Sequence, residues 1–123
     1  MTDCMGNLLS VSIHAANIHD TVGGCAVFDS AVTKYPTIDG VCADEGYRKT
    51  FENHVRERGL AVELSKKIKQ EWHVLPKRWR IERTFSWLNG SRRLSKDYEI
   101  TKNAEKNYVY ISHAVTLLNR LTA

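Results

Sequence analysis

The sequence predicts an α/β fold with at least one parallel pair of strands. Three segments have the pattern of strands, segments with the pattern of helices separate them, and two helices close the chain. With 123 residues, of which 42% are hydrophobic and 26% charged, the chain has the size and composition of one modest globular domain. We therefore expect residues 1–123 to form a single domain.

The first half of the chain begins with a strand, a helix and a second strand. Residues 8–16 (LLSVSIHAA) alternate apolar and polar side chains and are β-branched in the middle, which predicts a strand. A helix is expected from a candidate cap at Asp20 to about Tyr35, because its apolar residues recur at helical spacing. The short apolar run 38–43 predicts a buried strand, which ends at Asp44.

A polar helix and a third strand follow. Gly46 permits a turn, and the helix is expected to end near Arg58, where Gly59 closes it. Residues 60–64 alternate and predict the third strand. Functional residues of open α/β sheets gather at the carboxyl ends of strands, and Asp44 lies at such an end.

Two helices are expected in the last third of the chain. The first runs from Pro76 to about Ser91, and three residues form its apolar stripe: Ile81, Phe85 and Leu88. The last helix spans residues 104–121, and five of its apolar residues are expected to face the core: Ile111, Ala114, Val115, Leu118 and Leu121.

Membrane, secreted and zinc-binding proteins are disfavoured by simple features of the sequence. No uncharged apolar run approaches the ~18 residues of a spanning helix, and the N-terminus does not resemble a secretory signal. The three cysteines, Cys4, Cys25 and Cys42, are widely spaced, which is typical of idle thiols in a reducing cytosol. We expect a cytoplasmic protein without a membrane partner.

Positive charge is concentrated in one segment. The net charge is only +4, but residues 66–96 contain ten Lys or Arg and two acidic residues. Such a block predicts a polyanionic partner at one face, although a solvated helix face with a basic loop has the same pattern. The interleaved aromatics Trp79, Phe85 and Trp87 favour the first interpretation, but core packing would also account for them.

Asp44 and Glu82 are the best candidates for chemistry. Mg²⁺ prefers oxygen ligands, typically one or two carboxylates together with waters and substrate phosphates. Two such metals about 4 Å apart can activate a nucleophile and stabilise the leaving oxygen during phosphodiester cleavage. Two simpler interpretations stay open, with Asp44 as a turn residue or helix cap and Glu82 as an ion-pair partner of Arg78.

Three parts of the chain resemble the bacterial insertion-sequence transposases of the DDE type. Residues 41–47 (VCADEGY) are similar to the ADxGY strand end of that family. Residues 75–88 (LPKRWRIERTFSWL), with 92–98 (RRLSKDY), are similar to its glutamate helix, and residues 3–20 are similar to its middle segment. The resemblance covers nearly the whole chain and is closest to the insertion-sequence-five group.

The resemblance implies a ribonuclease H-like catalytic domain in which three carboxylates bind Mg²⁺ or Mn²⁺. Asp44 matches the second of these acids and Glu82 the third, so both are expected to be catalytic metal ligands. Arg78 matches the arginine four residues before the glutamate, whereas Leu75 and Asn89 replace the tyrosine and the lysine of the same signature.

The first catalytic aspartate of the family has no counterpart in this chain. Asp3 matches a hairpin position after the first strand, and Asp20 matches the head of the next helix. The resemblance therefore implies the C-terminal portion of a catalytic domain, incomplete at its N-terminus because the first strand is missing. The sheet edge exposed in this way would favour pairing with another chain.

The function implied by the resemblance is DNA transposition, through metal-dependent strand cleavage and transfer at insertion-sequence ends. We expect little or no activity from this chain alone, and a second polypeptide that supplies the missing aspartate. The partners would be element ends and target DNA in the bacterial cytoplasm and nucleoid, bound by a homo-oligomer. Nine residues are the expected DNA contacts: Lys77, Arg78, Trp79, Arg80, Arg83, Asn89, Arg92, Arg93 and Lys96.

Two other functions remain open. The first is a non-catalytic remnant that binds DNA or a transposase. The second is a metal-dependent nuclease unrelated to transposition, which would need a third acid close to Asp44. Glu45 is adjacent in sequence, but we expect its side chain to point elsewhere.

Overall fold

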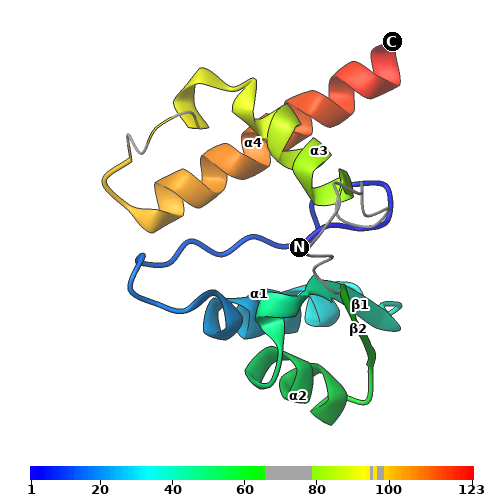
Figure 1. Ribbon diagram of the computed structural model, residues 1–123. Helices are drawn as coiled ribbons and strands as arrows, with labels where there is room; N and C mark the ends of the chain where they lie inside the picture. The colour runs from blue at the N-terminus through cyan, green and yellow to red at the C-terminus, as the bar shows by residue number, and fades with distance from the viewer. Residues whose placement is uncertain (66–78, 95, 97–98) are drawn as a thin grey trace, which may run out of the picture. The chain divides into compact units, whose positions relative to one another are not determined.

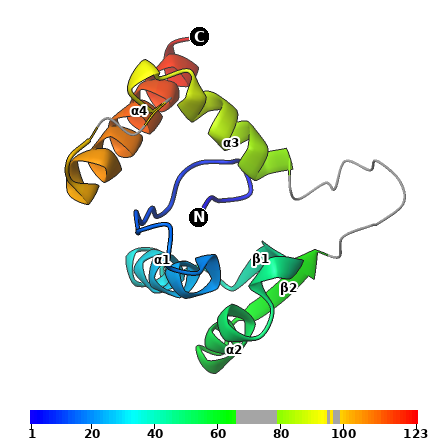
Figure 2. The ribbon, with the colours of Figure 1, turned by 60° about the vertical axis from the view of Figure 1, so that its left-hand side comes forward.

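The computed structural model describes residues 1–65, 79–94, 96 and 99–123. The chain divides into two compact units, one made of residues 1–14 and 80–123 and the other of residues 15–79 (Figure 1, Figure 2). Within the described residues, the sheet lies in the unit of residues 15–79 and the two C-terminal helices lie in the other.

The unit of residues 15–79 is built on a two-stranded parallel sheet. Helix α1 (Asp20–Lys34) precedes strand β1 (Gly40–Asp44), and the 3₁₀ helix η1 (Glu45–Tyr47) and helix α2 (Thr50–Glu57) lead to strand β2 (Ala61–Ser65). The register pairs Gly40 with Ala61 at one end and Asp44 with Ser65 at the other. The predicted parallel pair and the end of its first strand are thus confirmed, but no residue of β1 is buried, so the prediction that this strand is buried is wrong.

Helices α1 and α2 share an apolar core. Phe28 and Ala31 of α1 and Phe51 and Val55 of α2 are buried. The Phe28 and Phe51 rings meet edge to face with their centroids 5.9 Å apart, a favourable arrangement for aromatic pairs. The predicted helix 20–35 therefore contributes its apolar face as expected.

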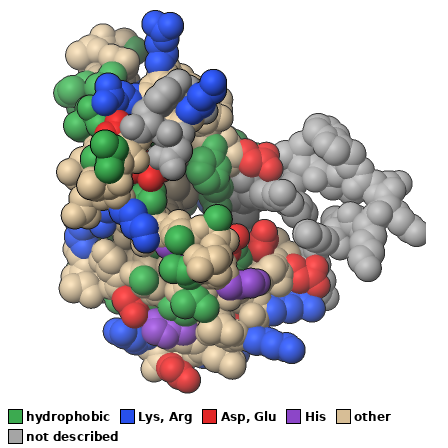
Figure 3. All heavy atoms as spheres, turned by 90° about the vertical axis from the view of Figure 1, so that its left-hand side faces the viewer, with side chains coloured by type: hydrophobic (Ala, Val, Ile, Leu, Met, Phe, Trp, Pro, Cys, Tyr) green, Lys and Arg blue, Asp and Glu red, His purple; other side chains and the backbone are tan. Residues whose placement is uncertain are grey.

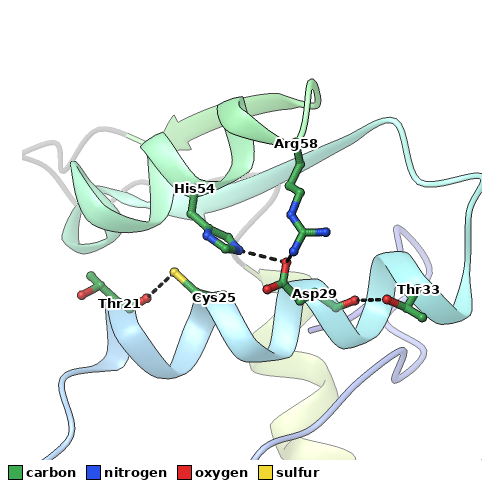
Figure 4. Close-up of polar contacts among 6 residues, drawn as sticks. All are labelled: Thr21, Cys25, Asp29, Thr33, His54 and Arg58. Carbon is green, nitrogen blue, oxygen red and sulfur yellow. Dashed lines mark hydrogen bonds and ion pairs between the residues drawn. The ribbon is translucent and has the colours of Figure 1, made fainter.

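Asp29 adds polar contacts between the same helices (Figure 4). Its Oδ1 atom lies 2.9 Å from His54 Nε2 and 3.0 Å from Arg58 Nη2. One carboxylate oxygen thus serves two groups at the C-terminal part of α2. Because all three side chains are partly exposed, solvent screens these interactions.

The start of α1 differs from the prediction. His19 is the cap, because its backbone is extended and its Nδ1 atom accepts a hydrogen bond from Thr21 N at 3.3 Å. Asp20 is instead the first residue of the helix, where its negative charge interacts favourably with the helix dipole.

The other unit combines residues 1–14 with three helical elements. These are helix α3 (Trp79–Asn89), the 3₁₀ helix η2 (Arg92–Leu94) and helix α4 (Lys102–Thr122). The buried Thr84 of α3 donates its hydroxyl hydrogen to Gly6 O at 2.7 Å, which ties α3 to the N-terminal segment.

The predicted strand 8–16 is wrong. Among the residues that the structure describes, its only ladder contact is an isolated antiparallel bridge between Leu8 and Thr2. The backbone hydrogen-bonds to side chains of α4 instead, since Leu8 N donates to His113 Nε2 at 3.0 Å and Val11 N donates to Tyr110 Oη at 3.3 Å. Alternation in the sequence cannot distinguish these partners from a neighbouring strand.

The apolar stripes predicted for the last two helices are also largely wrong. Leu88 is buried, but Ile81 and Phe85 of α3 are exposed. The five residues expected to face the core from α4 are all exposed, and Leu121 is 82% accessible. Ser112 and His113 are the buried residues of α4, because they meet the polar backbone and side chains beside them.

We define the apolar ridge of α4 as Ile111, Ala114, Val115, Leu118 and Leu121. The side chains of this ridge are exposed. Figure 3 shows one face of the molecule with its exposed hydrophobic side chains in green. None of the helices among the described residues is long and apolar enough to cross a membrane.

Candidate active site

Asp44 is exposed at the carboxyl end of β1. Its Oδ1 atom accepts a hydrogen bond from Gly46 N at 2.9 Å and thereby caps η1. The capping interpretation of Asp44 is therefore correct, and it is compatible with chemistry because the cap orients the carboxylate at the strand end.

The side chain of Glu45 interacts with Arg48. It forms an ion pair with Arg48, with Oε1 and Nη2 2.8 Å apart. The expectation that Glu45 points elsewhere agrees with this pair. Among the described residues, no group of three or more His, Cys, Asp or Glu is arranged to hold a metal ion.

Tyr47 holds the turn after Asp44 against α1, a role that the sequence did not reveal. A Cβ atom added to Gly24 would lie 2.9 Å from Tyr47 Cε1, so glycine allows the phenol ring to approach the helix. Tyr47 also meets Phe51 edge to face at 5.4 Å. The Gly23-Gly24 pair inside a helix was the one hint in the sequence that another group approaches the helix closely. Taken alone, the pair indicates only that the first turn of the helix is weak.

The pKa of the Tyr47 phenol reports its surroundings. Burial raises this pKa, and the negative charges of Asp20 and Asp44 raise it further. The charges of two carboxylates thus raise the pKa of one phenol. Asp20 therefore lies close enough to Tyr47 for an electrostatic effect, as Asp44 does.

Glu82 is exposed in the first turn of α3, where a negative charge interacts favourably with the helix dipole. Its proposed ion-pair partner, Arg78, lies outside the described residues. Asp44 belongs to the unit of residues 15–79 and Glu82 to the other unit.

The expected DNA contacts differ in their surroundings. Arg83 Nη2 donates to Met5 O at 2.6 Å, and Arg93 pairs with Glu99 at 2.9 Å and stacks on Tyr108. Four others are exposed: Trp79, Asn89, Arg92 and Lys96. Arg80 is partly buried, and Lys77 lies outside the described residues, as does Arg78.

The sequence matches a known protein family. The sequence model of the family described as "Transposase DDE domain" matches residues 41–119, which include both Asp44 and Glu82. This chain belongs to the transposase DDE domain family. No curated protein and no solved structure matches it.

Membership of the transposase DDE domain family has direct implications. It implies a ribonuclease H-like fold, in which a parallel strand pair covered by helices is an expected part. It also implies DNA transposition as the process in which the protein acts, DNA as a partner and a divalent metal as the usual cofactor of the family.

Proposed function

We propose that this transposase domain cleaves and transfers DNA strands at insertion-sequence ends and that it belongs to the insertion-sequence-five group. The observation that carries the proposal is the position of Asp44 at the carboxyl end of a parallel strand, within the family match that also includes Glu82. That end of the strands is where α/β folds gather functional residues.

Asp44 and Glu82 suit a hard divalent cation such as Mg²⁺ or Mn²⁺. Both side chains are exposed and provide carboxylate oxygens, the ligands that such ions prefer. The metal, when bound, would supply activation of the nucleophile and stabilisation of the leaving oxygen. The protein would contribute a carboxylate at the strand end, oriented by Gly46 N, and a second carboxylate from the first turn of α3.

Basic side chains would hold the DNA backbone during this chemistry. Arg80, Arg92 and Lys96 would neutralise phosphates without reading the base sequence. Trp79 and Asn89 are exposed and would add contacts to the same strand. The proposed set also contains Lys77, Arg78, Arg83 and Arg93, of which Arg93 would have to share its guanidinium with Glu99.

Two carboxylates hold a metal weakly, so we propose that a second polypeptide supplies a third acid. In that case the chain alone has little strand-transfer activity, and a homo-oligomer on DNA in the bacterial cytoplasm and nucleoid is the proposed working form. Pairing of this kind suits a protein that exposes apolar helix surface, as α4 does.

The experiment is a strand-cleavage assay on labelled element-end DNA with Mg²⁺. The expected result is no cleavage by the chain alone, and cleavage when a complementing polypeptide that carries an aspartate is added. Asp44→Asn and Glu82→Gln should abolish the restored activity, whereas the control Glu57→Gln should keep it. Restored cleavage that survives both substitutions would overturn the assignment, and cleavage by the chain alone would overturn the need for a partner.

A non-catalytic role in binding DNA or another transposase chain is the second candidate. The exposed apolar ridge of α4 favours it, because such a surface is typical of protein interfaces. Salt-dependent DNA binding that persists in Asp44→Asn and Glu82→Gln, with no activity from any complementing chain, would select this role.

A further inference from the structure

Two arginines lie against one tryptophan in the unit of residues 1–14 and 80–123. The Cζ atom of Arg83 is 4.9 Å from the centroid of the Trp87 ring, and the Cζ atom of Arg120 is 5.2 Å from it. The two guanidinium groups are therefore no farther apart than the Debye length of about 10 Å at 0.1 M salt, so their potentials add.

The N-terminal loop fixes both guanidinium groups. Arg83 Nη2 donates to Met5 O at 2.6 Å, and Arg120 Nη1 donates to Asn7 Oδ1 at 3.0 Å. Both acceptors are neutral oxygens, so these bonds orient the guanidinium groups without cancelling their charge. The Trp87 ring supplies a flat surface for both, and a planar group held in this way loses little entropy when it binds a ligand.

Asp3 is the acidic residue of this loop, and its carboxylate oxygens accept hydrogen bonds from N–H groups of the same loop. Oδ1 accepts from the backbone N–H groups of Met5 and Asn7, both at 2.8 Å, and Oδ2 accepts from Asn7 Nδ2 at 2.9 Å. Gly6 adopts φ +83°, which lets the chain turn tightly, and an added Cβ atom would lie 3.2 Å from Arg83 Nη2. The loop therefore shapes the arginine pair, and its own carboxylate is engaged by backbone and amide N–H groups.

We infer that Arg83, Trp87 and Arg120 form a phosphate-binding site for the DNA backbone, which extends the DNA surface of α3 onto the C-terminal part of α4. Guanidinium groups bind phosphate oxygens through paired, charge-assisted hydrogen bonds. Arg120 is exposed, and among the described residues its contacts are Asn7 and Trp87. The inference rests on the proposed function, because it requires that this chain bind DNA.

The test measures binding of a labelled DNA duplex by anisotropy between 50 and 300 mM salt. Wild-type affinity should fall with salt, and Arg120→Gln should reduce the slope of log K against log salt by about 1 and weaken binding about 5-fold at low salt. Arg120→Lys should keep the slope, because it keeps the charge. Arg56→Gln is the matched control, since it removes an exposed arginine of the other unit.

The outcomes separate this inference from the proposed function. If the wild type binds DNA and Arg120→Gln behaves as Arg56→Gln does, the phosphate site is refuted and the proposed function stands. If the wild type does not bind DNA, the proposed function fails and the site fails with it. An unfolding curve for each variant shows whether Arg120→Gln preserves the fold.

A second readout covers the case in which Arg120→Gln does not fold. The tryptophan emission of Trp87→Phe is subtracted from that of the wild type, which keeps Trp72 and Trp79 in place and isolates the signal of Trp87. Added DNA should change its emission, because phosphates would draw the two guanidinium groups from the indole or press them against it. Emission that stays constant while anisotropy reports full binding would overturn the site.

Discussion

The imidazole of His113 accepts a hydrogen bond from the backbone N–H of Leu8, with Nε2 and N 3.0 Å apart. The ring must be neutral at Nε2 for this bond to exist, because a protonated ring has no acceptor. Burial lowers the pKa of His113; Asp3 opposes this effect, and the charge of Arg120 adds to it. The contact between α4 and the N-terminal segment is therefore sensitive to protons.

We expect the free energy of unfolding to decrease as the pH falls below about 6.5, the pKa of an unperturbed histidine. The folded pKa is the lower one, so the unfolded state binds more protons in this range. The stabilisation is complete above the unfolded pKa and is lost as the pH falls through the folded value. Urea unfolding at several pH values measures this dependence.

His113→Gln tests the assignment of that pH dependence. A glutamine carbonyl can accept the Leu8 N–H but does not titrate, so the variant should lose part of the slope. An identical slope in His113→Gln and the wild type would show that another group is responsible.

Gly24→Ala should destabilise the unit of residues 15–79, although alanine is the better helix former by about 1 kcal/mol. The new Cβ atom would meet the Tyr47 ring at 2.9 Å, and overpacking of this kind costs about 1–3 kcal/mol. A net loss of about 1 kcal/mol is the expected result in chemical denaturation.

The same substitution should cost less in a Tyr47→Ser background, because the 2.9 Å contact with the phenol ring is then removed and the 3.3 Å contact with Phe51 Cδ2 remains. This double-mutant cycle isolates the contact between the two residues. A loss of equal size in both backgrounds would mean that the phenol ring is not what rejects alanine at this position.

Asp44→Asn and Asp44→Ala should separate the structural role of this residue from its chemical role. The asparagine Oδ1 atom can still accept from Gly46 N, so Asp44→Asn should keep the wild-type melting temperature, whereas Asp44→Ala should cost about 1 kcal/mol as a lost cap. Both variants should lose Mg²⁺ affinity in calorimetry. Unchanged Mg²⁺ binding by Asp44→Asn would remove Asp44 from the metal site.

Phe28→Ala and Leu118→Ala should differ greatly in their effect on stability. Phe28 is 1% accessible, and truncation of such a side chain costs about 3–5 kcal/mol. Leu118 is 59% accessible, so its truncation should cost less than about 1 kcal/mol. A large loss in Leu118→Ala at low protein concentration would show that the ridge of α4 is covered in solution.

The sequence predicted the unit of residues 15–79 well for a physical reason. Alternation and helical spacing report which side chains share a face, and in α1 that face meets the apolar side chains of α2, where Phe28 packs on Phe51. In α4 the same spacing identified Leu118 as part of an apolar face but could not reveal its surroundings. The buried residue is His113, because the segment beside it presents backbone N–H groups that require acceptors.

The candidate site, like the fold, was predictable from the sequence only in part. Asp44 follows from its place at the end of a strand, and its cap on Gly46 N follows from the turn that comes next. The packing of Tyr47 on Gly24 depends on how α1 approaches η1, which a single sequence does not report. The pairing of Arg120 with Trp87 likewise joins residues 33 positions apart on different helices.

Asp29 is the common acceptor of His54 and Arg58, and this arrangement makes the three positions interdependent. Loss of either donor leaves the other in place, so single substitutions at His54 and Arg58 should be mild. Loss of Asp29 leaves an arginine facing an imidazole, and no single change at either position restores both bonds. Such a hub couples the three positions, because the effect of changing Asp29 depends on whether His54 and Arg58 are still present.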